Sequence, residues 1–385
     1  MNRPVRNRKI LIIAGEASGD LHGSNLVKAM REIDPEIRFY GIGGEKMKEA
    51  GVDLVARSSD MAVVGLTEVV SRLPSILKVF FSLRKSLGES PPDLLIPIDY
   101  PDFNFPLASA AKKRGVRVFY YISPQVWAWR KGRIGKMKKI VDRMAVIFPF
   151  EKDFYAREGM EVAFVGHPLL DTVQIKSPKE EVLKSLNMEA GRGCRTIGIL
   201  PGSRESEVRR ILPDMLETAR ILNQKLSPVQ FLLPVADTLS EEFIRNIAGV
   251  FPPRLVLVKD HIYDAISAMD IAMVASGTAT LETALLGTPM IIIYRVSPLT
   301  YAVGRMLVDV DHIGIVNIIA GKTIVPEFIQ SGVIPMKMAD VITQILSDEK
   351  RYSEMKKDLA KVREKLGQPG ASRRAAELAY ELMKM

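Results

Sequence analysis

Short, continuous runs of apolar and β-branched residues alternate with amphipathic stretches along most of the chain. These runs lie at residues 10–14, 37–42, 94–98, 116–122, 144–148 and 162–165, and then at 196–200, 229–235, 255–258, 271–274 and 290–294. Runs that are apolar throughout are typical of parallel strands covered by helices on both faces. The pattern therefore predicts an α/β protein of doubly wound, Rossmann-like sheets, with ligands at the carboxyl ends of the strands.

The length and the spacing of these runs predict two domains. The chain has 385 residues, which exceeds a usual single domain. Gly166-His167-Pro168 closes the first series of runs, and a polar stretch at 174–181 precedes the second. We expect domains at 1–170 and 171–365, followed by a helix at about 366–385. That helix packs back onto the first domain or onto a second subunit, so a homodimer is one of the expected states.

Composition narrows the partners and the compartment. The net charge of +9 favours anionic partners, among which nucleic acid, phosphorylated sugars and anionic lipid all qualify. Cys194 is the single cysteine, which excludes an intrachain disulfide and fits a reducing compartment. No apolar stretch approaches the roughly 18 residues of a spanning helix, and the basic start leads into a strand rather than a signal peptide. We expect a cytosolic protein, or one on the cytosolic side of a membrane.

Two glycine turns in the second half are candidate anion sites. Pro201-Gly202-Ser203-Arg204 follows the strand at 196–200 and opens a helix, where backbone N–H groups and a planar guanidinium suit a diphosphate. Ser276-Gly277-Thr278 repeats this arrangement, with Glu282 one turn into its helix. A carboxylate there can accept both hydroxyls of a ribose. The competing interpretations are an ordinary turn with a surface arginine and a simple helix cap.

Acidic residues follow two strands of the first half. Asp99 and Asp102 come after the run at 94–98, and Glu16 follows the first run, two residues before Ser18. A carboxylate at the end of a strand can act as a general base. The competing interpretation is that these side chains only cap helices and turns. The four histidines lie far apart without cysteine partners, so no metal site is expected.

Two further segments carry aromatic, basic or apolar residues in excess. Trp127 precedes a cationic stretch that contains Arg130, Arg133 and four lysines, which suits nucleic acid, phosphate or a membrane surface. The helical stretch at 61–87 is apolar around much of its circumference, so it is either buried or lies in a membrane interface. Periodicity alone favours burial.

Six motifs in one order resemble the lipid-A-disaccharide synthases, inverting glycosyltransferases of Gram-negative bacteria with the two-domain B-type (GT-B) fold. The likeness runs from about Ile10 to the end of the chain. The motifs are Gly15-Glu16-Ala17-Ser18-Gly19-Asp20, Asp99-Tyr100-Pro101-Asp102-Phe103-Asn104, Ser123-Pro124-Gln125-Val126-Trp127-Ala128-Trp129, Phe148-Pro149-Phe150-Glu151-Lys152, Leu200-Pro201-Gly202-Ser203-Arg204 and Ser276-Gly277-Thr278-Ala279-Thr280-Leu281-Glu282.

The resemblance implies transfer of 2,3-diacylglucosamine from UDP to 2,3-diacylglucosamine 1-phosphate, without a metal or organic cofactor. It also implies peripheral attachment to the cytosolic face of the inner membrane, with UDP in the second domain and the acceptor in the first. The catalytic base would be Asp99, with Glu16 as the alternate. The UDP site would comprise Ser203, Arg204, Gly277, Thr278, Thr280, Glu282 and Asn317. The acceptor and membrane side would comprise Ser18, Asp102, Asn104, Trp127, Arg130, Leu77, Phe80 and Phe81.

Two other functions stay open from the residues alone. A UDP-N-acetylglucosamine 2-epimerase of the same broad fold would also use Gly166-His167-Pro168 and a phosphate-binding arginine. A basic nucleic-acid-binding protein would show binding that weakens steeply with salt. The resemblance itself excludes nucleic acid as a partner.

Overall fold

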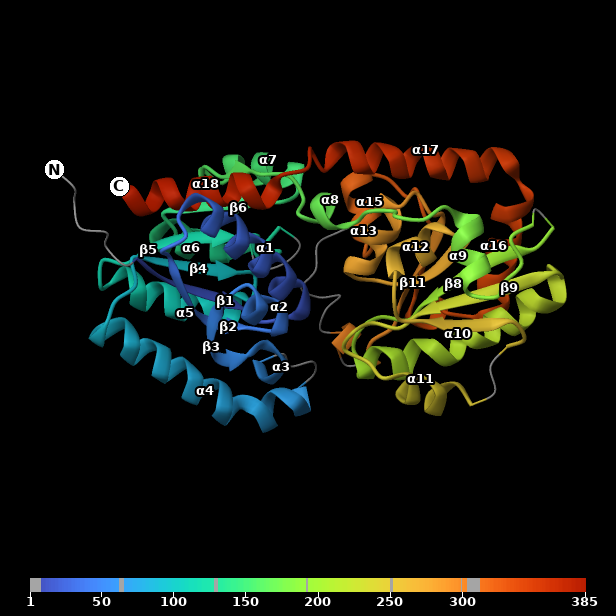
Figure 1. Cartoon of the computed structure of the whole chain (residues 1–385), viewed down its shortest axis with the longest axis horizontal. Helices are drawn as coiled ribbons and strands as arrows, with labels where there is room; N and C mark the ends of the chain where they lie inside the picture. Colours follow the sequence, from blue (N-terminus) through green and yellow to red (C-terminus); the bar gives the residue numbers. More distant parts are fainter. Residues whose placement is uncertain are drawn as a thin grey trace. The chain divides into compact units, whose positions relative to one another are not determined.

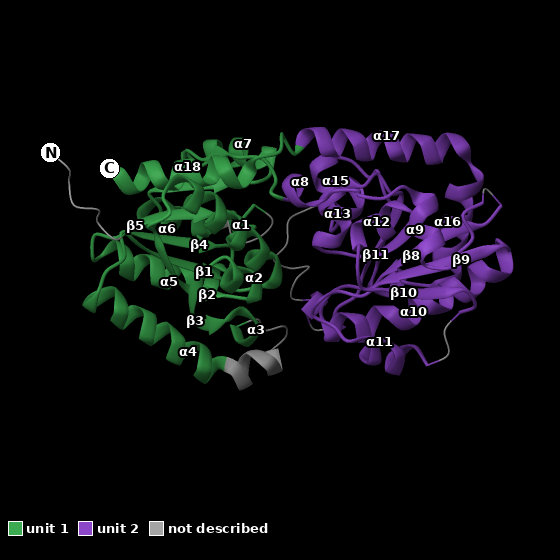
Figure 2. Ribbon diagram, viewed as in Figure 1, with its two compact units in different colours: residues 1–168, 366–385 green, residues 169–365 purple. Residues whose placement is uncertain are grey.

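The computed structural model describes residues 8–61, 66–127, 131–191, 193–249, 252–298, 300–302 and 312–385. The chain divides into two compact units, shown in green and purple in Figure 2. Unit 1 comprises Met1–Pro168 with Leu366–Met385, and unit 2 comprises Leu169–Lys365. Each unit is built around its own parallel sheet, as Figure 1 shows.

Unit 1 contains a seven-stranded parallel sheet in the order β3-β2-β1-β4-β5-β6-β7. From β1 outward this is the doubly wound order, in which successive connections run first to one edge and then to the other. The central strands are buried along almost their whole length, as the continuous apolar runs predicted. The strands are β1 (Lys9–Ala14), β2 (Arg38–Gly43), β3 (Val52–Arg57), β4 (Leu94–Ile98), β5 (Arg117–Tyr121), β6 (Arg143–Val146) and β7 (Ala163–Phe164).

Helices cover this sheet in packed groups. The first and last helices of the chain, α1 and α18, pack on each other, while α4 packs on α5 and α5 on α6. Arg374 of α18 donates to Val165 O at 2.9 Å, which ties this last helix to the end of β7. The helices are α1 (Ala17–Ile33), α2 (Glu45–Glu49), α3 (Ser58–Met61), α4 (Leu66–Glu89), α5 (Pro101–Lys112), η1 (Lys131–Arg133), α6 (Ile134–Ile140), α7 (Pro149–Arg157) and α18 (Ala371–Lys384).

Unit 2 repeats the same architecture with a six-stranded parallel sheet in the order β10-β9-β8-β11-β12-β13. Its strands are β8 (Arg195–Leu200), β9 (Val229–Pro234), β10 (Leu255–Val258), β11 (Ile271–Ala275), β12 (Met290–Tyr294) and β13 (Glu327–Ile329). Its helices are α8 (Leu169–Thr172), α9 (Lys179–Ser185), α10 (Glu205–Lys225), α11 (Glu241–Ala248), α12 (Ile262–Ser267), α13 (Thr278–Leu285), α15 (Ile315–Ala320), η2 (Gln330–Gly332), α16 (Pro335–Ser347) and α17 (Glu349–Lys365).

The predicted fold class is confirmed, and every predicted apolar run contains a strand. Two strands were missed, and both lie at a sheet edge. β3 alternates buried or half-buried with exposed residues, and β13 has three half-buried residues. Neither gives a continuous apolar run, because an edge strand has a solvated side. Among the described residues, no helix combines the length and apolar character that crossing a bilayer requires.

Candidate active site

In each unit two of the predicted motifs are brought together at the centre of the sheet. Ala14 at the end of β1 pairs with Ile98 at the end of β4, and Leu200 at the end of β8 pairs with Val274 near the end of β11. These pairs mark the point where the strand order reverses, so the helices that follow diverge and leave a crevice. The turns after β1 and β4 therefore form one candidate site, and those after β8 and β11 form another.

The turns of unit 1 enclose a cavity of about 290 Å³. Four segments contribute to it: the three that follow β1, β4 and β5, and η1. The lining residues are Gly15, Glu16, Ser18, Gly19, Ile98, Asp99, Tyr100, Pro101, Pro124, Gln125, Val126 and Arg133. The predicted base Asp99 and its alternate Glu16 thus face the same space.

The backbone at Asp99 has an unusual conformation that buried side chains hold in place. Asp99 and Tyr100 both have positive φ, 43° and 46°, which is uncommon for residues other than glycine. Tyr120 Oη and Asn104 Nδ2 donate to the Asp99 carbonyl at 2.6 and 2.7 Å. Pro101 then begins α5. Strained backbone of this kind persists where its surroundings over-determine it, and such positions cluster at functional sites.

The environment of Asp99 tunes its acidity toward neutral pH. Burial, reinforced by the nearby negative charge of Glu16, raises the pKa of the Asp99 carboxyl to about 7. Both effects disfavour the ionised form, and the one opposing effect is a backbone hydrogen bond from Tyr100. A carboxyl that titrates near neutral pH is suited to accept and release a proton.

Gly15 and Tyr100 join the two turns by close packing. A Cβ on Gly15 would lie 2.4 Å from the Tyr100 ring, so only glycine leaves room for the ring. The ring stacks on Phe103 at 5.6 Å between centroids, and its hydroxyl donates to Met61 O at 3.0 Å. The Tyr100 ring of the second motif therefore fits here only because residue 15 of the first motif is glycine.

A buried carboxylate, Glu151, fixes the chain where α7 begins. It is 1 % exposed and accepts from Phe148 N at 2.9 Å and from Ile147 N at 3.2 Å. Burial raises the pKa of its carboxyl to about 7. Glu151 belongs to one of the six sequence motifs, but its role is not evident from the sequence. Its position three residues after the end of an apolar run, as in a helix cap, is the available signal.

The polar and aromatic residues predicted for the acceptor side of unit 1 lie in different surroundings. Ser18 lines the cavity, whereas Asn104 is buried and acts on the Asp99 backbone rather than on the cavity. Asp102 is 68 % exposed and pairs with Arg133. Trp127 is buried, with its ring edge-to-face against Phe150 at 4.9 Å, so it packs in the interior rather than facing a membrane. Arg130 lies outside the described residues.

In unit 2 the first anion turn has the predicted strand–turn–helix geometry. Arg204 directly precedes α10, and both it and Ser203 are exposed. Gly202 has φ 106°, and a Cβ there would lie 2.1 Å from the Glu207 carboxylate. Glu207 was missed from sequence. Burial raises its pKa, while Arg204 and the Ser203 N–H lower it. A carboxylate of this protein therefore already contacts the turn that was predicted to hold an anion.

Some residues predicted at the second turn of unit 2 are exposed, and others are buried and bond within the protein. Gly277 and Thr278 are exposed, whereas Thr280 is fully buried and donates to Gly277 O at 2.7 Å. Glu282 accepts from Tyr263 Oη at 3.1 Å. Burial and the Glu282 charge raise the pKa of Tyr263, so this hydroxyl remains a donor at neutral pH.

Asn317 is fully buried, and protein groups use its whole amide. Its Nδ2 donates to Val325 O at 2.9 Å and to Glu327 Oε1 at 2.7 Å. Its Oδ1 accepts from the backbone N–H groups of Ile324 and Val325. Asn317 therefore fixes the chain before β13, and any effect on a nucleotide passes through that segment.

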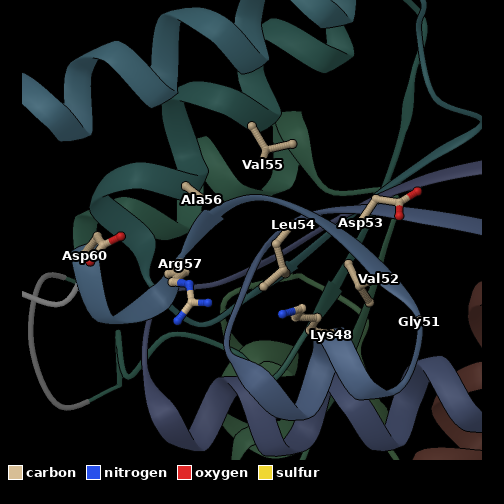
Figure 3. A pocket seen from close by; sticks show the side chains of 9 residues that line it. All are labelled: Lys48, Gly51, Val52, Asp53, Leu54, Val55, Ala56, Arg57 and Asp60. Atoms are coloured by element: carbon tan, nitrogen blue, oxygen red, sulfur yellow. The ribbon is translucent and has the colours of Figure 1, made fainter.

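A larger cavity of about 620 Å³ opens along the edge strand β3 (Figure 3). Lys48 and Arg57 lie between the carboxylates of Asp53 and Asp60, which are at its two ends. Both cations already pair with Glu45, at 3.7 and 3.0 Å. The cavity lies away from the switch point and contains neither glycine turn, so we assign the chemistry to the smaller one.

The described residues contain no group of three or more His, Cys, Asp or Glu side chains arranged to hold a metal ion. The acidic residues near the β1 turn have other partners. Asp20, for example, accepts from Gly44 N and Met47 N at 2.6 and 3.0 Å and so caps α2.

Comparison with known proteins gives close relatives over the full chain. The model of the lipid-A-disaccharide synthetase family matches residues 10–382. A lipid-A-disaccharide synthase of Syntrophus aciditrophicus is 55 % identical over 381 residues, covering 99 % of each chain. One of Geobacter metallireducens is 48 % identical over 377 residues, covering 98 % of each.

Solved structures with low sequence identity share the fold. MurG of Acinetobacter baumannii matches with a TM-score of 0.60 at 14 % identity, covering 97 % of this chain and 99 % of that one. The Neisseria meningitidis UDP-GlcNAc 2-epimerase bound to UDP-GlcNAc matches with a TM-score of 0.61 at 14 % identity, covering 97 % and 100 %. The predicted GT-B architecture is confirmed.

The contact between Gly15 and Tyr100 gives a first prediction. Gly15→Ala forces the Tyr100 ring to move and disturbs the Asp99 turn, so we expect turnover to fall at least about tenfold, the effect of roughly 1.4 kcal/mol. Steady-state rates measure this, and a thermal melt measures the accompanying destabilisation. Gly135→Ala is the control, because no atom lies within 4 Å of its added Cβ. Unchanged turnover in Gly15→Ala would show that the two turns act independently.

Proposed function

The chain belongs to the lipid-A-disaccharide synthetase family, and from that membership we propose how its two switch-point sites share the reaction. It is a hexosyltransferase of lipid A biosynthesis. It transfers 2,3-diacylglucosamine from UDP to 2,3-diacylglucosamine 1-phosphate, with inversion, and forms a β-1,6 linkage. Neither the epimerase nor the nucleic-acid alternative is favoured by this membership.

Asp99 is the general base in this proposal. The observation that carries it is a carboxyl with pKa near 7, facing a 290 Å³ cavity on a backbone turn held by Tyr120 and Asn104. Inverting transfer is a single displacement, in which the acceptor 6-hydroxyl attacks the anomeric carbon, the C–O bond to UDP breaks and the base takes the hydroxyl proton. Glu16 lies beside Asp99 and raises its basicity. The acceptor sugar then occupies the unit 1 cavity, with Ser18 in its wall.

The donor nucleotide binds at the turns of unit 2. Arg204 and the N–H groups at the start of α10 lie where charge develops on the departing diphosphate, so they stabilise the transition state electrostatically. Gly277 and Thr278 supply a second exposed helix start. Glu282, oriented by Tyr263, accepts the ribose hydroxyls. Thr280 and Asn317 are positioning residues, because their polar groups already bond within the protein.

One face of α4 is the membrane contact that we propose. Leu73, Leu77 and Phe81 are 44 %, 43 % and 57 % exposed, and their spacing of four residues aligns them along the helix. Phe80 instead packs on Phe103 in the core. Acyl chains reach the cavity from a bilayer, so peripheral attachment to the cytosolic face of the inner membrane suits both substrates. The homodimer expected from sequence stays a prediction.

Removal of the base tests the mechanism. Asp99→Asn leaves the shape of the cavity but cannot take the proton, so kcat falls about 10²–10⁴-fold while UDP affinity by calorimetry is unchanged. Asp60→Asn removes an equal charge from the other cavity of unit 1 and should leave both values unchanged. Near-normal kcat in Asp99→Asn would remove Asp99 from the proton transfer.

The donor site makes a paired prediction of opposite signs. Arg204→Ala removes a charged hydrogen-bonding group, worth about 1.5–3 kcal/mol, so UDP binding weakens roughly 10–100-fold and turnover falls with it. Glu207→Gln removes the negative charge beside the turn, so UDP binding tightens. Calorimetric titration with UDP measures both. Equal UDP affinity in wild type and both variants would place the diphosphate elsewhere.

The α4 surface predicts a separable effect on membrane binding. Replacing Leu73, Leu77 and Phe81 with Ser removes about half a side chain of burial at each position, roughly 1 kcal/mol apiece. The affinity for anionic phospholipid vesicles, measured by co-sedimentation, should therefore fall about 100-fold, while UDP affinity stays the same. Ile334→Ser with Met336→Ser is the control, because these side chains are exposed apolar groups of unit 2. Equal losses in both variants would contradict the assignment.

A further inference from the structure

The unit 1 cavity is lined by more acidic groups than basic ones. Glu16 and Asp99 contribute two carboxyl groups, and among the described lining residues Arg133 contributes the one permanent cation. Arg133 comes from η1, which follows both catalytic turns in the sequence, and its side chain is 21 % exposed. The mechanism above gives this guanidinium no role.

Arg133 is fixed in orientation by two neighbours. Its Nη2 donates to Asp102 Oδ1 at 2.5 Å, and its guanidinium lies over the Phe105 ring at 5.7 Å from the centroid. Phe105 is 4 % exposed and belongs to the core of unit 1, so its ring is held by close packing. An arginine that is oriented before its ligand arrives loses little side-chain entropy on binding.

The proposed acceptor presents a phosphate to this cavity as well as a hydroxyl. A phosphate monoester carries about −1.5 to −2 charges at neutral pH, and Glu16 and Asp99 repel it. Arginine matches phosphate geometry with two parallel hydrogen bonds. Resting on the proposed function, we infer that Arg133 is the specificity-determining residue that binds the phosphate of the acceptor and so turns its hydroxyl toward Asp99.

Asp102 keeps this cation in place without competing strongly for it. Its carboxylate is 68 % exposed, and an exposed ion pair contributes only about 0–1 kcal/mol. The acceptor phosphate therefore replaces Asp102 as the partner of Arg133, or binds beside it, at a small cost in free energy. In return it gains two charge-assisted hydrogen bonds from the guanidinium. Asp102 thus acts on the acceptor through Arg133.

The test compares two acceptors in detergent micelles: diacylglucosamine 1-phosphate and the same lipid without its phosphate. Wild type should prefer the phosphorylated acceptor. Arg133→Ala should lose about 10–100-fold in kcat/KM on that acceptor, mainly through KM, while its rate on the phosphate-free acceptor changes less than about twofold. Arg133→Lys should recover part of the loss, because it restores the charge without the planar fork. Lys113→Ala, which removes an exposed cation at the end of α5, should match wild type on both acceptors.

Three results would overturn the inference. Equal losses on both acceptors in Arg133→Ala, with an unchanged thermal midpoint, would mean that Arg133 does not read the phosphate. Full activity on both would mean that it does not act at all. Loss of sedimentation with phosphatidylglycerol vesicles, with unchanged acceptor preference, would assign the guanidinium to lipid headgroups instead. Wild-type protein that transfers to neither acceptor would instead refute the proposed function, before any variant is compared.

Discussion

The parallel pairing of β1 with β4, and of β8 with β11, is the constraint on which the sites depend. Each pair lies where the winding of its sheet reverses, so the helices after the two strands leave in different directions. Motifs that are about 80 residues apart in the sequence thereby become neighbours. The chemistry of the chain follows from this placement, and the helices outside it serve mainly to bury the sheets.

The two sites use opposite electrostatic strategies. At Asp99, burial and a second carboxylate destabilise the ionised form, which makes the group a stronger base than an ordinary aspartate. At the turn before α10, helix N–H groups and Arg204 stabilise negative charge. The Glu207 carboxylate already interacts with Arg204 and the Ser203 N–H before a ligand binds. Under the proposed function, the base therefore lies in a negative environment and the leaving group departs from a positive one. Proton removal and departure of an anion require this distribution of charge.

Sequence alone predicted the central strands and the turns that follow them, because continuous apolar runs and glycine–serine turns are local signals. It missed β3 and β13, whose solvated sides break the apolar run. The family resemblance assigned Trp127 to the acceptor and membrane side and Asn317 to the UDP site, but both side chains are buried, because a sequence does not show which side chains satisfy one another. The hydroxyl of Tyr120, which holds the Asp99 carbonyl, and the carboxylate of Glu151 depend on contacts between separate elements. The paired charges of Arg133 and Asp102, 31 residues apart, have no local pattern at all.

The central claim is that Asp99 removes the acceptor proton and that Glu16 tunes it. The most direct test is the pH dependence of kcat/KM in wild type and in Glu16→Gln. Wild type should lose activity on the acidic side with an apparent pKa near the value of about 7 that the environment of Asp99 imposes. Removing the Glu16 charge makes ionisation of Asp99 easier, so this acidic limb should move to lower pH with activity retained at its plateau. An acidic limb that stays in place, or loss of the plateau activity itself, would contradict the account.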